Sequence, residues 1–199
     1  MSKSSIFSSM KNWLTVRNLL NGLFFTALLL VLFNPAAKVL VIRGLMKIGL
    51  FQPGVTTTRN PAVPDISFID SKGKTISLST LKGKVVFINF WATWCPPCIA
   101  EMTSINDLHQ QFKADQNIIF LMVDADHAFN KSVPFMEKHQ YGLSVYAATS
   151  NVPASIYNGS LPTTVILDKE GRLVFHHEGA ADYTNSKFIN YLTMLAANN

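Results

Sequence analysis

The stretch VVFINFWATWCPPC, residues 85–98, decides how the rest of the chain is interpreted. It begins as a continuous run of β-branched and aromatic residues, which is typical of a strand covered on both faces. It ends in Trp94 and in Cys95 and Cys98, which two prolines separate. These are the only two cysteines among 199 residues, so three explanations compete: a redox pair, half of a metal site, or a structural crosslink.

A helix is predicted directly after the strand. Apolar side chains recur at three or four residues, which indicates an amphipathic helix; they are Ile99, Met102, Ile105, Leu108 and Phe112. The first turn of a helix has unpaired N–H groups and a partial positive charge, which lower the pKa of a cysteine placed there. Pro96 and Pro97 suit this turn because it does not need their missing N–H groups. We therefore expect Cys95 to be the exposed nucleophile and Cys98 to be the resolving thiol.

The competing explanations of the pair are weaker. Zinc needs about four ligands, and the chain has one CxxC and no second pair; His176 and His177 are adjacent on a predicted strand and point to opposite faces. Covalent haem attachment needs a histidine after the second cysteine, where this chain has Ile99. A crosslink across two residues closes too short a loop to stabilise much. We therefore expect no metal, and no cofactor other than a redox-active disulfide between Cys95 and Cys98.

The remaining segments predict an α/β domain with a mixed sheet. The expected order is ββ-β-α-β-α-ββ-α, and its β-α-β part requires a parallel strand pair with a right-handed crossover. Asp124, Asp126 and His127 follow a buried strand and are predicted to form a solvated loop. The other predicted elements are a hairpin over 66–78, a strand over 118–124, a helix over 132–142, a hairpin over 163–177 and a helix from 185.

Charge is distributed unevenly along the chain. Residues 1–64 hold seven Lys or Arg and no acidic residue, whereas residues 65–199 hold ten basic and twelve acidic residues. The formal net charge of +5 therefore belongs to the N-terminal segment. Because its basic residues flank apolar stretches, a membrane surface is favoured as partner over nucleic acid.

The N-terminal segment predicts a membrane anchor. Residues 18–37 carry no charge, and about twenty apolar residues in a helix match the roughly 30 Å of a hydrocarbon core. A cleaved signal peptide is the alternative, but FNPAAK fits the small-residue cleavage rule poorly. We predict a short basic segment over 1–17, a transmembrane anchor over 18–37, an interfacial amphipathic segment and linker over 38–59, and a folded domain over 60–199. Basic residues flank the anchor on both sides, so charge does not decide its orientation.

Two of these stretches resemble the thioredoxin superfamily. VVFINFWATWCPPC looks like its strand and active-site turn, and SLPTTVILD, residues 160–168, resembles its cis-proline loop, with Pro162 as the matching proline. FIDSKGKTISLSTLKGK before the strand and CIAEM after the turn are similar to the membrane-anchored, extracytoplasmic TlpA/ResA-like thiol–disulfide oxidoreductases of bacteria. The resemblance covers about residues 61–196. It implies a thioredoxin-like fold, in which helices flank a mixed central sheet, with an N-terminal β-hairpin and an N-terminal transmembrane helix.

The resemblance also implies roles for residues outside the cysteine pair. Leu161–Pro162 would be a cis peptide that exposes the Leu161 backbone to an extended partner chain, whereas an ordinary trans proline is the alternative. With Trp94, Pro96 and Pro97, these two residues form the expected substrate-binding surface.

The sequence departs from cytoplasmic thioredoxins six residues before the first cysteine. Their buried Asp is replaced here by Asn89, which cannot take a proton. Glu101 lies three residues after Cys98, on the same side of the helix, and is the candidate general base. The alternative for Glu101 is a solvated helix charge.

The sequence therefore predicts a membrane-tethered enzyme of the periplasm, or another extracytoplasmic space, that exchanges disulfides with proteins. The resemblance favours a reductant, for example of apocytochrome thiols or secreted proteins, supplied with electrons by a membrane thiol carrier. A disulfide-forming oxidant, a non-enzymatic binding module and a partner-presenting membrane subunit stay open. A thiol peroxidase would need its own Arg near a lone cysteine, and no Arg lies between Arg59 and Arg172.

Overall fold

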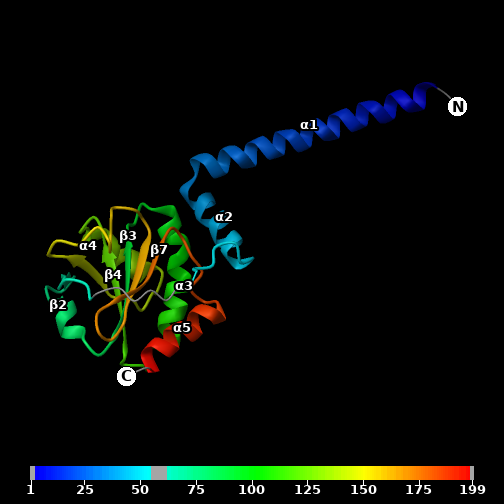
Figure 1. Ribbon diagram of the computed structural model, residues 1–199. Coiled ribbons are helices and arrows are strands. Elements are labelled where there is room, and N and C mark those ends of the chain that lie inside the picture. Colours follow the sequence, from blue (N-terminus) through cyan, green and yellow to red (C-terminus); the bar gives the residue numbers. More distant parts are fainter. Residues whose placement is uncertain (1–2, 55–61, 198–199) are drawn as a thin grey trace.

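The computed structural model describes residues 3–54 and 62–197 (Figure 1). A long helix, α1 (Lys3–Phe33), projects away from an α/β domain, and a second helix, α2 (Pro35–Lys47), lies between α1 and that domain. The described part of the domain contains three further helices and one 3-10 helix: α3 (Pro96–Phe112), α4 (Phe129–Lys138), α5 (Ser186–Ala197) and η1 (Leu78–Leu81).

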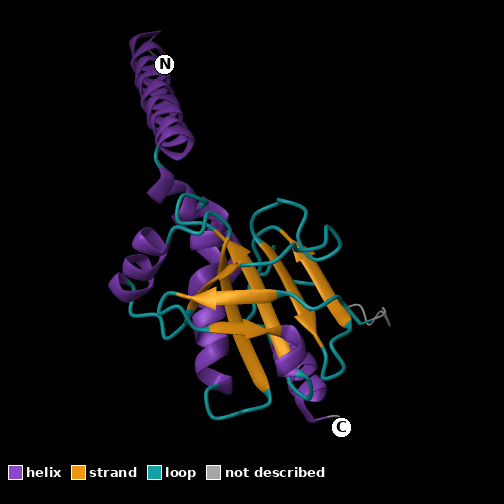
Figure 2. Ribbon diagram, turned by 90° about the vertical axis from the view of Figure 1, so that its left-hand side faces the viewer, coloured by secondary structure: helices purple, strands orange, loops and turns teal. Residues whose placement is uncertain are grey.

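Helices flank a seven-stranded mixed sheet with the order β2-β1-β5-β4-β3-β6-β7 (Figure 2). The central strands β3 and β4 are parallel, as the β-α-β prediction requires, and β6 runs antiparallel to β3. The strands are β1 (Ser67–Asp70), β2 (Thr75–Ser77), β3 (Val85–Trp91), β4 (Ile118–Asp124), β5 (Val145–Ala148), β6 (Thr163–Leu167) and β7 (Leu173–Glu178).

The strand β5 was not predicted. It joins the β1–β2 hairpin to the rest of the sheet, because it pairs antiparallel with β1 and parallel with β4. Its four residues, Val-Tyr-Ala-Ala, are too few to show a clear alternation before the polar loop that follows. The predicted α/β thioredoxin-like fold is otherwise confirmed.

The strand β3 separates two hydrophobic cores. Phe87 and Trp91 belong to the core formed with α3 and α5, whereas Ile88 and Phe90 belong to the core on the η1 side. Successive side chains of a strand point to opposite faces, so Asn89 points to the same face as Phe87 and Trp91. A polar side chain is therefore buried between the central strand and α3.

The helix α1 ends before the C-terminal end of the predicted anchor segment. We expected the anchor to cover residues 18–37, but α1 stops at Phe33 and α2 begins at Pro35. Proline cannot donate the hydrogen bond that would continue α1, and the Asn34 side chain caps α2 by accepting bonds from the N–H groups of Ala36 and Ala37 at 2.9 and 3.3 Å. Asn34 therefore separates the two helices, and residues 35–37 belong to the second one. Part of the predicted linker, residues 55–59, lies outside the described residues.

Candidate active site

The two cysteines form a disulfide at the junction between β3 and α3. Cys95 is the N-cap residue of α3, and its sulfur accepts a hydrogen bond from the Cys98 backbone N–H at 3.3 Å. Pro96 and Pro97 occupy the first two helical positions, as predicted. The Cys95 sulfur therefore lies at the positively polarised end of α3, where a thiolate is stabilised.

The expectation that Cys95 is exposed is wrong for this disulfide form. Cys95 is 3 % exposed and Cys98 is fully buried. Both belong to the core that packs α3 against β3. The disulfide bond joins the Cys95 sulfur to the buried Cys98. Trp94, which is 64 % exposed, and the half-buried prolines form the accessible surface beside the pair.

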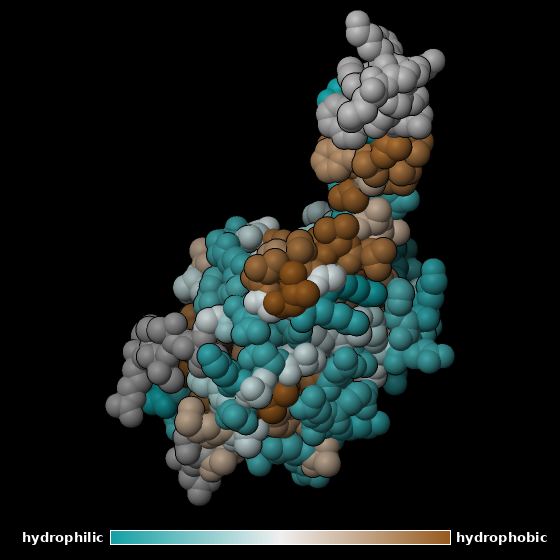
Figure 3. Space-filling view, turned by 90° about the vertical axis from the view of Figure 1, so that its right-hand side faces the viewer, coloured by the Kyte–Doolittle hydropathy of each residue, from teal (hydrophilic) through white to brown (hydrophobic). Residues whose placement is uncertain are grey.

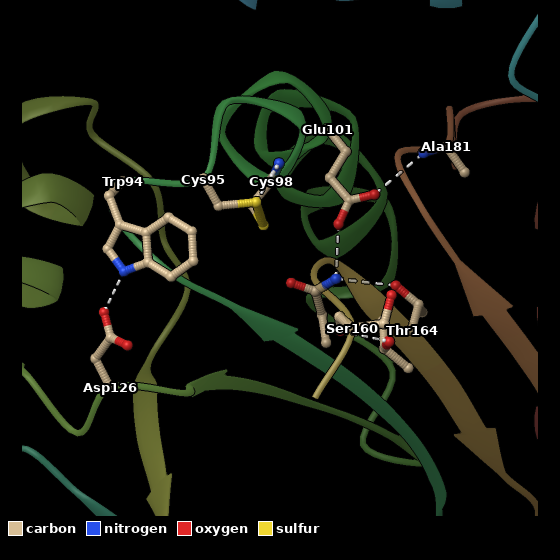
Figure 4. The surroundings of a disulfide bond; sticks show 10 residues. Trp94, Cys95, Cys98, Glu101, Asp126, Ser160, Thr164 and Ala181 are labelled. Atoms are coloured by element: carbon tan, nitrogen blue, oxygen red, sulfur yellow. Dashed lines mark hydrogen bonds between the residues drawn. A yellow bond between two sulfur atoms is a disulfide. The ribbon is translucent and has the colours of Figure 1, made fainter. Parts of the chain in front are cut away.

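Glu101 lies one turn after Cys98 and is fully buried. Figure 4 shows its carboxylate and the disulfide on the side of α3 that faces the sheet. The side chain of Asn89 donates to Glu101 Oε1 at 2.8 Å, and the Ala181 N–H donates to Oε2 at 3.1 Å. The predicted alternative, a solvated helix charge, is therefore wrong.

Burial determines the protonation of Glu101. Loss of hydration disfavours the carboxylate and raises the pKa of Glu101 from 4.5 to about 8, although the two hydrogen bonds from Asn89 and Ala181 oppose the shift. Within residues 3–54 and 62–197, Glu101 forms no ion pair. The site therefore contains a group that can bind or release a proton near neutral pH, one helical turn from the redox pair.

The hydrogen bonds of Glu101 continue to residues that the sequence did not single out. Asn89 Nδ2 also donates to Thr164 Oγ1 at 2.9 Å, and the Tyr183 hydroxyl donates to the same oxygen at 2.7 Å. Burial and the Glu101 charge hold the pKa of Tyr183 well above 10, so its phenol stays a donor. No sequence motif marks Tyr183, whereas Thr164 belongs to the proline loop motif but carried no predicted role.

The proline loop lies beside the same core. The Leu161–Pro162 peptide is cis, as the resemblance implied, and Leu161 packs against the core cluster that contains both cysteines. In the described part of the chain, the Leu161 backbone N–H and C=O make no hydrogen bond. The fold therefore leaves both groups without a hydrogen-bond partner among the described residues, beside the disulfide.

Trp94 is held by the loop that contains Asp124, Asp126 and His127, for which the sequence predicts a solvated conformation. Its indole N–H donates to the Asp126 carboxylate (Figure 4). Asp124, also placed in that loop, is 1 % exposed and accepts the N–H groups of Asp126 and Ala128 at 3.0 and 2.9 Å. Asp124 therefore shapes the turn, and Asp126 fixes the tryptophan beside the cysteine pair.

A disulfide at a strand–helix junction beside a cis-proline loop, on this sheet, defines a thioredoxin-like thiol–disulfide oxidoreductase. The chain belongs to the redoxin family, which it matches over residues 58–195, and is a TlpA/ResA-like member of the thioredoxin superfamily.

Two relatives and two solved structures illustrate the match. Over 163 residues the chain is 32 % identical to the thiol-disulfide oxidoreductase ResA of Bacillus thuringiensis (strain Al Hakam), covering 77 % of this chain and 86 % of that relative. Over 133 residues it is 32 % identical to ResA of Bacillus subtilis (strain 168), and the match covers 66 % of this chain and 73 % of that relative. A thiol:disulfide interchange protein from Chlorobium tepidum TLS has a TM-score of 0.56 at 24 % identity, covering 71 % of this chain and 99 % of that one. StoA from Bacillus subtilis has a TM-score of 0.51 at 20 % identity, and the match covers 68 % of this chain and 98 % of StoA. At these identities the two solved structures show that the fold is shared.

The buried carboxyl predicts a pH dependence of stability. Because the folded-state pKa of Glu101 is about 8 and its ordinary value is 4.5, the folded form binds the proton more tightly. The unfolding free energy should therefore fall as the pH rises from about 4.5 to 8, by up to about 1.4 kcal/mol per pH unit. Glu101→Gln should remove this component. Denaturant unfolding of the oxidised full chain in detergent, from pH 5 to 9, measures the difference between the two proteins; a difference that does not change with pH contradicts the prediction.

Proposed function

We propose that this protein is a membrane-tethered, extracytoplasmic reductant of protein disulfides that works through its WCPPC pair. The observation that carries the proposal is the position of Cys95 at the N-cap of α3, bonded to Cys98, with the buried, ionisable Glu101 one turn further along. The redox-active disulfide is the only cofactor that this chemistry needs.

In the proposed reaction, the Cys95 thiolate of the reduced protein attacks one sulfur of a partner disulfide. The partner's other sulfur leaves as a thiolate and takes up a proton, and a mixed disulfide joins Cys95 to the partner. The Cys98 thiolate then attacks the Cys95 sulfur and releases the partner as a dithiol. Two electrons have passed to the partner, and the Cys95–Cys98 disulfide is restored.

Glu101 is the proposed base for the second step. Its pKa of about 8 lies close to the ordinary value of about 8.5 for a thiol, so proton transfer from Cys98 to the carboxylate is nearly balanced. Asn89 and the Ala181 N–H hold the carboxylate oxygens on the sheet-facing side of α3. Burial thus gives Glu101 the basicity that a solvated glutamate lacks.

The partner is proposed to bind as an extended chain across the site. The unpaired Leu161 backbone groups can hydrogen-bond such a chain, while Pro96, Pro97 and Trp94 provide apolar contacts. Pro162, which was expected on this surface, is buried, so its proposed part is to hold Leu161 in the cis turn. Since Cys95 is 3 % exposed in the disulfide form, docking or reduction must first open its surroundings.

The helix α1 supports the proposed location. Its segment Val16–Phe33 has a mean hydropathy of 1.8 and none of it is buried against the domain. We propose that α1 spans the membrane, with the domain in the periplasm or another extracytoplasmic space, and that a membrane thiol carrier reduces the disulfide again.

Cysteine substitutions test the order of attack. The reduced parent should reduce insulin disulfides, Cys95→Ser should abolish turnover, and Cys98→Ser should trap a mixed disulfide because the resolving thiol is missing. Insulin precipitation and non-reducing electrophoresis measure both effects. An inactive parent would favour a binding module, and turnover by Cys95→Ser would remove Cys95 as the nucleophile.

Glu101→Gln tests the base. The variant should keep its fold and slow the release of the mixed disulfide by about 10²-fold near pH 7, with the pH dependence around pH 8 lost. Stopped-flow tryptophan fluorescence across pH 6 to 10 measures the rate. Glu137→Gln, on the exposed surface of α4, is the matched control. Rates equal to those of the parent at every pH would disprove the assignment.

The direction of electron flow is tested by the reduction potential. A reductant should have a reduction potential closer to that of thioredoxin, about −270 mV, than to that of DsbA, about −120 mV. Titration of the full chain against dithiothreitol buffers, with free thiols counted by alkylation, gives the potential. A value near −120 mV would make the protein a disulfide-forming oxidant.

A further inference from the structure

The helix α2 packs one face against the catalytic domain. Met46 is 4 % exposed and forms a small core with Ala100 of α3 and Ala180 of the loop before α5. Val39 and Ile42, which precede Met46 by seven and four residues, pack against the same cluster. This spacing places all three apolar side chains on one face of α2.

Two hydrogen bonds attach α2 and the turn that follows it, together called the α2 segment (residues 35–51), close to the redox pair. Arg43 Nη2 donates to the carbonyl oxygen of Ile99, the residue after Cys98, at 3.1 Å. The Asp182 N–H donates to the carbonyl oxygen of Phe51 at 2.8 Å. The α2 segment is thus attached to the active-site end of α3 through Arg43 and to the loop before α5 through Phe51.

The outer face of the α2 segment is apolar and exposed. The large apolar residues on it are exposed by 38 to 73 %; they are Leu40, Val41, Ile48, Leu50 and Phe51. Figure 3 shows a hydrophobic patch on this face of the molecule, close to the apolar surface of α1. Lys38 and Lys47 are exposed on the same helix. An exposed apolar surface of this kind marks an interaction site.

The position of α1 indicates what covers the exposed apolar face of the α2 segment. Only Asn34 separates α1 from α2, so an α1 that spans a membrane leaves α2 at the bilayer surface. Figure 1 shows α2 running across the direction of α1, between α1 and the domain, and Figure 3 views the molecule from the side toward which α1 extends. The apolar face of α2 is therefore turned toward the membrane. Thirteen residues span only about 20 Å and cannot cross it, whereas an amphipathic helix with lysines suits the headgroup layer.

We propose that α2 docks the catalytic domain onto the bilayer, with its inner face bound to α3 and its outer face in the headgroup layer. The inference rests on the proposed function in that α1 spans the membrane. Its consequence is that the Cys95–Cys98 pair works close to the lipid surface, on partner disulfides that lie near the membrane. A flexible tether would instead let the domain reach partners far from the bilayer.

Fluorescence quenching in lipid nanodiscs tests the docking. The full chain, with its native pair oxidised, carries one bimane-labelled cysteine at a time: Ile48→Cys on the outer face, Lys72→Cys in the exposed β1–β2 turn across the domain, or Leu29→Cys within α1. A lipid with a nitroxide near its headgroup should quench the label at 48 at least about threefold more than the label at 72, and aqueous iodide should show the opposite order.

The outcomes separate the two proposals. If a deep-chain nitroxide quenches the label at 29 while the label at 48 is as accessible to iodide as the label at 72, α1 spans the membrane and α2 does not dock. If the label at 29 is not quenched, the anchor itself is wrong and the inference fails with it. If the label at 48 is shielded from both iodide and lipid nitroxide, a protein covers this face, which also overturns the inference.

A charge on the outer face tests the consequence for activity. With the reduced protein in lipid vesicles, Ile48→Asp should reduce the rate on a peptide disulfide tethered to the lipids of those vesicles at least about threefold, because the domain leaves the surface, and should leave the rate on the soluble peptide unchanged. Lys72→Asp is the control and should change neither rate. An unchanged ratio of tethered to soluble rates in Ile48→Asp would show that α2 does not set the position of the active site.

Discussion

The hydrogen bond between Asn89 and Glu101 joins the central strand to the active-site helix inside the core. A carboxyl group that loses its hydration is costly to ionise, and here two hydrogen bonds offset only part of that cost. The result is a pKa of about 8 rather than 4.5, one helical turn from the disulfide. Cytoplasmic thioredoxins place the titrating group on the strand, whereas this chain places it on the helix and uses the strand position to hold it.

This arrangement follows from the alternation of side chains along the strands. Asn89 and Thr164 lie on neighbouring strands in direct register, so one amide can donate to both Thr164 and Glu101. Tyr183 completes the group from a loop 19 residues beyond Thr164. The buried polar atoms are thus positioned by the sheet, the active-site helix and one loop together, and a change in any of them alters the surroundings of the carboxyl group.

Local signals account for what the sequence predicted, and long-range packing for what it did not. The buried strand, the helix after it and the prolines at its first two positions depend on residues within a few positions of one another. The burial of Cys95 and the bond between Asn89 and Thr164 depend on segments that meet only in the folded sheet. The end of α1 is different, because Asn34 and Pro35 are a local helix-start signal. The predicted end of the anchor followed the absence of charge over residues 18–37 and did not take this helix-start signal into account.

The helix α3 connects these features because it is a single element with three kinds of contact. Its first turn carries the disulfide, the next turn carries Glu101 toward the sheet, and Ile99 and Ala100 contact α2. A displacement of α2 would therefore act on the same short segment that holds the thiols and the carboxyl group. Since protein interiors are close-packed, α2 belongs to the same packed unit as the first turns of α3, and its contacts with Ile99 and Ala100 bring the N-terminal segment directly against the helix that carries the redox site.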